Sequence, residues 1–141
     1  MVVSEVLGFN PPRRALQRVY ERLLAAYGPQ HWWPGDSPFE VMVGAVLTQN
    51  TAWRNVERAI ANLEAAGALT PTAVASLPPA ELAALIRPAG YFNVKAQRLQ
   101  AFCRFLLEAG GVDALGARPT AALRHALLAV HGIGPETADD I

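Results

Sequence analysis

The sequence predicts an all-α protein, and three observations support this fold class. Apolar residues recur at helical spacing in successive segments, helix start and stop signals separate those segments, and no strand-like alternation persists. A chain of 141 residues with 52% hydrophobic residues is also long enough to bury one core. We therefore expect a globule of short helices without a sheet.

The first predicted helix lies within residues 1–29, an N-terminal helix region. One face of it is apolar at i, i+3, i+4 and i+7 spacing, and Gly28-Pro29 ends it. The residues on that face are Leu16, Val19, Tyr20, Leu23, Leu24 and Tyr27.

The next helix begins at the segment SPFE, residues 37–40. Ser37 is placed as N-cap, Pro38 at the first helical position and Glu40 at the third, which is a capping box with a proline start. The following residues, FEVMVGAVLTQ, are apolar nearly all round, so this should be a central buried helix. Asn50 and Thr51 are then expected to cap the helix after it.

Further helices are predicted along the rest of the chain. TPTAVASL and PPAELAALI give two short pieces, each started by a proline. NVKAQRLQAFCRFLLEAGG predicts a longer helix with Asn93 as its cap and Gly110 as its stop. RPTAALRHALLAV is the last complete helix, and PETADDI begins another.

Composition excludes several function classes. The formal net charge is zero, so no overall field attracts nucleic acid or membrane, although eleven of the twelve basic residues are Arg. A single cysteine, Cys103, excludes a disulfide framework and a cysteine-ligated metal or iron–sulfur site within these residues. No apolar run is long enough to cross a membrane, and no secretory leader is recognisable. We expect a cytoplasmic, monomeric protein without a metal.

The Gly132-Ile133-Gly134 turn between the last two predicted helices forms a helix–hairpin–helix. Its glycines allow a sharp backbone turn whose N–H groups point outward, and Ile133 is expected to point inward and anchor it. Backbone N–H groups at the start of a helix can hold one DNA phosphate without any basic side chain.

Three segments, in order, resemble the endonuclease III superfamily of helix–hairpin–helix DNA glycosylases. They are FEVMVGAVLTQNTAWRNVERAI, RPAGYFNVKAQRL and VHGIGPETADDI. The tripeptide WWP, the segment LTQNT and Glu136 look most like the 3-methyladenine DNA glycosylase branch. The resemblance implies that residues 30–141 form a helical barrel ending in the hairpin. It also implies an enzyme that flips a damaged base out of double-stranded DNA and cuts its N-glycosidic bond.

The resemblance also implies roles for individual residues. Gln49 would fill the hole left by the flipped base, Tyr91 would be the wedge between bases, and Gly132, Ile133 and Gly134 would bind the backbone. We expect Gln49 to be exposed, and Phe92 rather than Tyr91 to anchor its loop. The base pocket would be formed by Trp32, Pro34, Trp53 and Glu136, with Trp33 in the core. Electron-rich indole faces favour a cationic, alkylated purine.

Glu136 stands where lyase members of the family carry a lysine nucleophile, so the resemblance implies a monofunctional glycosylase that uses water. The family's catalytic Asp lies beyond Ile141, and the chain ends seven residues into the hairpin's second helix. We therefore expect a fragment without the C-terminal part. The iron–sulfur cluster of some relatives would need that part, so no cofactor is expected here. The alternatives are an endonuclease III-like glycosylase and lyase for oxidised pyrimidines, or a non-catalytic DNA-binding module.

Overall fold

The computed structural model describes residues 12–31, 33 and 35–141. Contacts divide the chain into two compact units, residues 1–34 and residues 35–141. In the described part of the first unit, helix α2 spans Arg13–Tyr27 and ends at Gly28, whose N–H donates to Leu24 O at 2.8 Å. The predicted helix is confirmed, and its apolar residues remain exposed.

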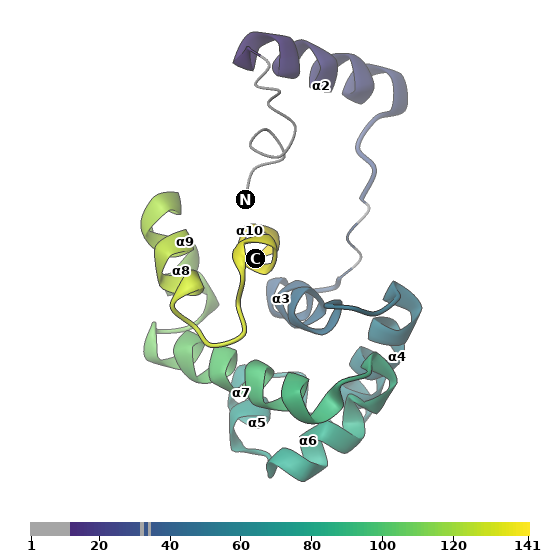
Figure 1. The fold of residues 1–141 in the computed structure, drawn as a ribbon, viewed down its shortest axis with the longest axis vertical. Coiled ribbons are helices and arrows are strands. Elements are labelled where there is room, and N and C mark those ends of the chain that lie inside the picture. Colours follow the sequence, from purple (N-terminus) through teal and green to yellow (C-terminus); the bar gives the residue numbers. More distant parts are fainter. Residues whose placement is uncertain (1–11, 32, 34) are drawn as a thin grey trace. The chain divides into compact units, whose positions relative to one another are not determined.

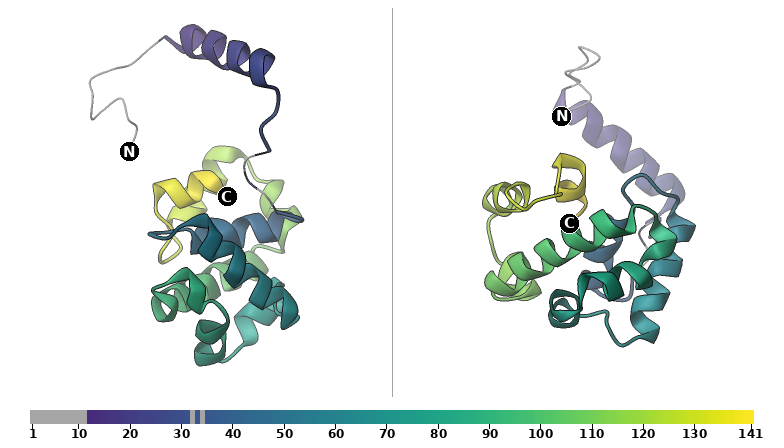
Figure 2. Two further views of the ribbon diagram at one scale, coloured as in Figure 1. Left: turned by 90° about the vertical axis from the view of Figure 1, so that its right-hand side faces the viewer. Right: turned by 60° about the horizontal axis from the view of Figure 1, so that its bottom comes forward.

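The second unit, residues 35–141, is built of short helices (Figures 1 and 2). No strand occurs among the described residues, so the all-α prediction is confirmed. The elements are α3 Pro38–Leu47, α4 Trp53–Ala65, α5 Pro71–Ser76, α6 Pro79–Leu85, the 3-10 helix η1 Arg87–Ala89, α7 Phe92–Glu108, α8 Val112–Gly116, α9 Thr120–Leu128 and α10 Pro135–Asp140.

Helix α3 is the buried central helix that the sequence predicts. Ser37 Oγ accepts a hydrogen bond from Glu40 N at 3.2 Å. Glu40 Oε2 in turn accepts from Asp36 N at 2.9 Å, one residue before the N-cap that a standard capping box would use. Every residue from Met42 to Leu47 is buried, as expected for a helix that is apolar nearly all round.

Helix α7 holds the second unit together. It packs against α5 and α6 on one side and against α3 on the other, as Figures 1 and 2 show. The side chains of Leu99, Phe102 and Leu106 on this helix are fully buried. Because α7 contacts both α3 and α6, its side chains can fix the positions of the loops that follow these helices.

Two predicted helix caps are wrong. Helix α7 begins at Phe92, and its N-cap is Tyr91 rather than Asn93, because the chain leaves η1 through Gly90 and enters the helix from a left-handed Tyr91 with φ of 44°. Helix α4 has Ala52 as N-cap and no side-chain cap. Thr51 Oγ1 instead accepts from Asn55 Nδ2 at 3.0 Å.

The core of the second unit draws residues from α3 through α10, with Phe39 the earliest and Ala138 the last. None of the helices in the described residues is both long and apolar enough to cross a bilayer.

Candidate DNA-binding hairpin and base pocket

The hairpin turn lies between α9 and α10 and depends on one glycine. Gly132 has φ of 89°, and a Cβ there would overlap Cγ of Arg98 and lie 2.6 Å from its Cδ. Ile133 is 5% exposed and its N–H donates to Val130 O at 3.1 Å, so it anchors the turn as expected. Gly134 has φ of −89° and open space where a Cβ would stand. Only Gly132, therefore, is required by the turn itself.

The two helices of the hairpin are also joined by an ion pair at the surface. Arg124 Nε donates to Asp139 Oδ1 at 2.7 Å, and Arg124 Nη2 to Asp139 Oδ2 at 3.3 Å. The hydrogen bond from Arg124 lowers the pKa of the Asp139 carboxyl below its ordinary value of 3.8. Asp139 thus serves the hairpin as a structural carboxylate.

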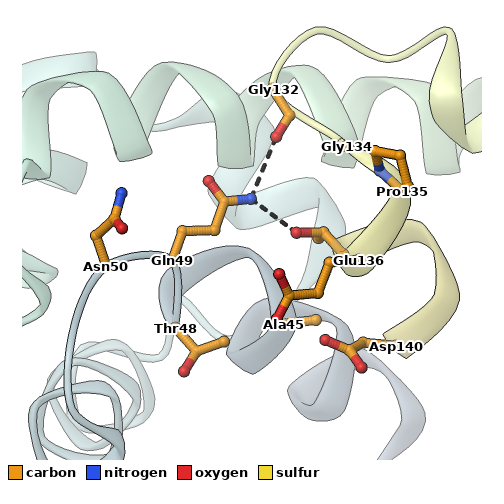
Figure 3. A pocket seen from close by; sticks show the side chains of 10 residues that line it. Ala45, Thr48, Gln49, Asn50, Gly132, Gly134, Pro135, Glu136 and Asp140 are labelled. Atoms are coloured by element: carbon orange, nitrogen blue, oxygen red, sulfur yellow. Dashed lines mark hydrogen bonds between the residues drawn. The ribbon is translucent and has the colours of Figure 1, made fainter. Parts of the chain in front are cut away.

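Gln49 follows α3 and points its amide at the hairpin (Figure 3). Its Nε2 donates to Gly132 O at 3.2 Å and to Thr137 Oγ1 at 2.9 Å. Its Oε1 accepts from Arg98 Nη1 at 2.9 Å. Gln49 is consequently half-buried rather than exposed, since hairpin and α7 hold both ends of its amide.

A pocket of about 520 Å³ opens beside this amide, within the range of small-molecule sites. Figure 3 shows Glu136 and Asp140 among its lining residues, both from α10. Burial, then the neighbouring carboxylates of Glu136 and Asp139, raise the pKa of Asp140 above its ordinary value of 3.8. The lining residues are Ala45, Thr48, Gln49, Asn50, Gly132, Gly134, Pro135, Glu136, Thr137 and Asp140.

The tryptophans expected around the base are only partly placed by the structure. Trp53 is the first residue of α4, is half-buried against the core, and its Nε1 donates to Glu57 Oε1 at 3.1 Å. It does not belong to the lining of the pocket that contains Glu136. Trp32 and Pro34 lie outside the described residues, and Trp33, expected in the core, is half-buried.

Comparison with known proteins identifies the family. Residues 43–139 match the HhH-GPD superfamily of base excision DNA repair proteins. The chain belongs to this superfamily. It is 43% identical over 129 residues to a protein named as a DNA repair glycosylase from Methanocaldococcus jannaschii, covering 89% of this chain and 59% of that protein. It is 33% identical over 102 residues to endonuclease III of Thermotoga maritima, covering 72% of this chain and 45% of that enzyme.

A solved structure agrees with this assignment of the HhH-GPD fold. The 3-methyladenine DNA glycosylase MagIII of H. pylori, bound to 1,N6-ethenoadenine, superimposes with a TM-score of 0.72 at 31% identity. The match covers 91% of this chain and 61% of that one. The chain thus spans about 60% of the length of the solved relative and of the M. jannaschii protein.

The loop that carries Tyr91 presents an exposed aromatic side chain in this HhH-GPD chain. Tyr91 is 72% exposed and is held in left-handed backbone, a conformation that is rare for a bulky residue. Phe92 behind it is half-buried and packs on the core, and the Arg87 guanidinium lies 5.5 Å from the centre of its ring. As expected from the sequence, Phe92 anchors the loop and Tyr91 points outward.

Sequence reasoning missed three residues of the site: Lys95, Arg98 and Thr137. Lys95 is 2% exposed, and burial, then the charge of Arg98, lowers the pKa of its amine below 10.5. A signal was present, because Lys95 lies four residues before Leu99 on the apolar face of the helix. A lysine on a core-facing position needs acceptors. For Lys95 these are the backbone carbonyls of Leu47 and Ala89.

The described residues do not suit an iron–sulfur cluster, which is normally held by several thiolates. Cys103 is the one cysteine of the sequence. It is fully buried in the core of α7, and burial raises the pKa of its thiol to about 12. Cys103 is therefore an apolar core residue.

Proposed function

We propose that this chain carries the DNA-binding and base-recognition part of a DNA glycosylase that releases alkylated purines, such as 3-methyladenine, by hydrolysis without a lyase step. The observation that carries the proposal is the position of Glu136. Its carboxylate lines the pocket next to Gln49. The resemblance to the family implies that lyase members carry an amine at this position.

The charge of the pocket supports an alkylated purine as ligand. Glu136 and Asp140 are the charged residues of its lining. Alkylation at a ring nitrogen makes a purine cationic, and nearby carboxylates stabilise a cation while they add nothing for a neutral oxidised pyrimidine. The resemblance to the family further implies stacking roles for Trp32, Pro34 and Trp53, because indole faces favour cations. Trp53 itself lies outside the lining of this pocket.

The environment of the lysine supports a mechanism without a Schiff base. Lys95 is the one lysine of the sequence. Its amine is buried and donates to two backbone carbonyls, so it is not available as a nucleophile in this structure. Imine formation requires an accessible amine. The family's catalytic Asp, which the resemblance places after Ile141, is assigned no substitute here, because Asp139 is engaged with Arg124.

We assign the DNA contacts to three features: the hairpin turn, the exposed side chain of Tyr91, and the Gln49 side chain, whose amide can exchange its hydrogen bonds within the protein for bonds to DNA. The N–H groups of Gly132 and Gly134 would hold a phosphate, because the N–H of Ile133 already donates to Val130 O. Tyr91 would be inserted between bases, and Gln49 would fill the vacated position. In the free protein the Gln49 amide is bonded to Gly132, Thr137 and Arg98. Filling the duplex therefore requires these bonds to be exchanged for bonds to the orphaned base.

Binding and trapping experiments test the proposal. The 141-residue chain should bind a duplex with a single alkylated purine more tightly than the same duplex undamaged or with an oxidised pyrimidine. It should release no base, and borohydride should trap no covalent complex. Equal affinity for the three duplexes would indicate a non-catalytic DNA-binding module. A preference for the oxidised pyrimidine together with a trapped adduct would indicate the endonuclease III-like lyase.

A further inference from the structure

The buried amine of Lys95 joins the ends of two helical elements that are far apart in sequence. Lys95 Nζ donates to Leu47 O at 2.9 Å and to Ala89 O at 2.7 Å. Leu47 is the last residue of α3, and Ala89 is the last residue of η1. Carbonyls at helix ends lack partners within the helix and carry partial negative charge, so an ammonium group between two of them is stabilised by both.

Each of these two carbonyls lies just before a residue that we assign to DNA. Leu47 precedes Gln49 by two residues, and Ala89 precedes Tyr91 by two. Both loops contain residues with positive φ, namely Asn50 with φ of 54° in the first and Gly90 and Tyr91 in the second. Neither loop is regular structure, so each needs an external bond to fix where its tip stands.

A second side chain of α7 acts on the first of these loops. Arg98 is one turn after Lys95, and its Nη1 donates to the amide oxygen of Gln49 at 2.9 Å. Helix α7 therefore bonds the backbone before Gln49, the side chain of Gln49 and the backbone before Tyr91.

We propose that Lys95 is a positioning residue that holds the Gln49 loop, residues 48–51, and the Tyr91 loop, residues 90–91, at a fixed separation, so that the two side chains meet the same base step of the duplex. The inference rests on the proposed function for what the two loops do, but the link between them can be tested without DNA. A pair of side chains that must enter one distorted step has to be held to within about 0.5 Å, which loops alone do not provide.

The chain offers a matched control for Lys95 on the same helix. Gln100 is 3% exposed, and its Nε2 donates to Val74 O at 3.1 Å and to Leu77 O at 2.7 Å. It too satisfies two backbone carbonyls, but these belong to the end of α5. Gln100→Met thus removes the same kind of bond pair as Lys95→Met without touching either DNA-facing loop.

Amide hydrogen exchange measures the link directly. In Lys95→Met, exchange at Thr48, Thr51 and Gly90 should accelerate together, by about tenfold to hundredfold, as expected for the loss of a hydrogen bond from a charged donor. In Gln100→Met, acceleration should be confined to residues 74–77. Acceleration in only one of the two loops, or the same pattern in both variants, would overturn the proposal.

If Lys95→Met does not fold, the wild-type chain provides the same answer. In low concentrations of denaturant, Thr48 and Gly90 should exchange through one opening event with the same denaturant dependence, because one amine closes both loops. Opening of the two loops with different denaturant dependences would contradict the link.

A duplex with an abasic-site analogue, and 2-aminopurine opposite it, tests the consequence for DNA. Wild type and Gln100→Met should bind it more tightly than an intact duplex and raise the 2-aminopurine fluorescence, whereas Lys95→Met should lose the preference and the fluorescence change. Absence of both effects in wild type would contradict the proposed function while the exchange result still decides the link. Normal fluorescence with Lys95→Met would overturn the positioning role.

Discussion

Gly132 and Gly134 flank the same turn but meet different requirements. At Gly132 the left-handed backbone costs any L residue about 1–2 kcal/mol, and an added Cβ would also displace Arg98. At Gly134 the backbone is extended and the space is open. We expect Gly132→Ala to lower the free energy of unfolding by about 1–3 kcal/mol and Gly134→Ala to change it by less than about 0.5 kcal/mol, measured by urea denaturation. Equal losses of unfolding free energy in the two variants would show that the turn has no specific requirement for glycine at position 132.

Asp139 and Asp140 are neighbours whose carboxyls respond to pH in opposite directions. The pKa of Asp140 is raised by burial and by Glu136, so the folded state binds its proton more tightly and loses stability as pH rises from about 3.8. The pKa of Asp139 is lowered by Arg124, so its contribution is present above about 3.8 and is lost as pH falls through the lower value in the folded state.

The pH prediction follows from this difference. At about pH 7, Asp140→Asn should raise the Tm and Asp139→Asn should lower it. The difference for Asp140→Asn should vanish as pH falls below about 3.8, whereas the difference for Asp139→Asn should vanish only at lower pH, where the folded-state carboxyl of Asp139 is protonated. Thermal unfolding over this range measures both. Shifts of the same sign in the two variants would show that the carboxylates are not in distinct environments.

Single residues of the site were predictable where backbone geometry decides, and not where tertiary contacts decide. The Gly-Ile-Gly pattern correctly placed Ile133 in the core, because a helix–turn–helix leaves the middle residue facing inward. The exposure of Gln49 was mispredicted, since its partners Gly132, Thr137 and Arg98 lie far away in sequence. Their convergence depends on the packing of α3, α7 and α10, which no local pattern contains.

At the scale of elements, the start of α3 depends on two side-chain hydrogen bonds. Ser37 Oγ satisfies the N–H of Glu40, and Glu40 satisfies the N–H of Asp36. Loss of such a cap costs about 1 kcal/mol. We therefore expect Ser37→Ala to lower the free energy of unfolding by about 1 kcal/mol in urea titrations. Ser76→Ala is the control, because Ser76 bonds a carbonyl within its own helix and should cost less than about 0.5 kcal/mol.

The positions of the helices could be predicted from apolar periodicity and from prolines at helix starts. The helix caps could be predicted only in part. Ser37 was correctly placed because a cap, a proline and a glutamate occur together at fixed spacing. Asn93 was misplaced because a left-handed Tyr91 caps α7 two residues earlier, and a tyrosine in that conformation is not expected from sequence. The link that Lys95 makes between α3 and η1 was equally hidden, because a carbonyl at a helix end has no residue signature.

At the scale of the whole molecule, the described core is contained in the second unit. Core residues run from Phe39 to Ala138, and no described residue of α2 is buried. The second unit also contains the residues that we assign to DNA binding. They are Gln49, Tyr91 and the turn at 132–134. Trp32 and Pro34, to which the resemblance gives a role in recognising the damaged base, belong to residues 1–34.

This division predicts that affinity for DNA and selectivity for the damaged base can be separated. A chain of residues 35–141 should unfold cooperatively at nearly the same temperature as the full chain, because it retains the described core. It should bind undamaged duplex with similar affinity. Its preference for an alkylated purine should fall by about tenfold or more, since stacking on an aromatic wall is worth about 1–3 kcal/mol per base.

Trp32→Ala in the 141-residue chain is the matched variant, because it removes one proposed wall and keeps every other residue. It should reproduce the loss of preference without a change in Tm, and fluorescence titration with damaged and undamaged duplexes measures both affinities. If residues 35–141 keep the full preference, Trp32 and Pro34 are not walls, and selectivity lies with Trp53 and the carboxylates of α10. If residues 35–141 fail to fold, Trp32→Ala in the 141-residue chain alone decides whether Trp32 contributes to the preference for the damaged base.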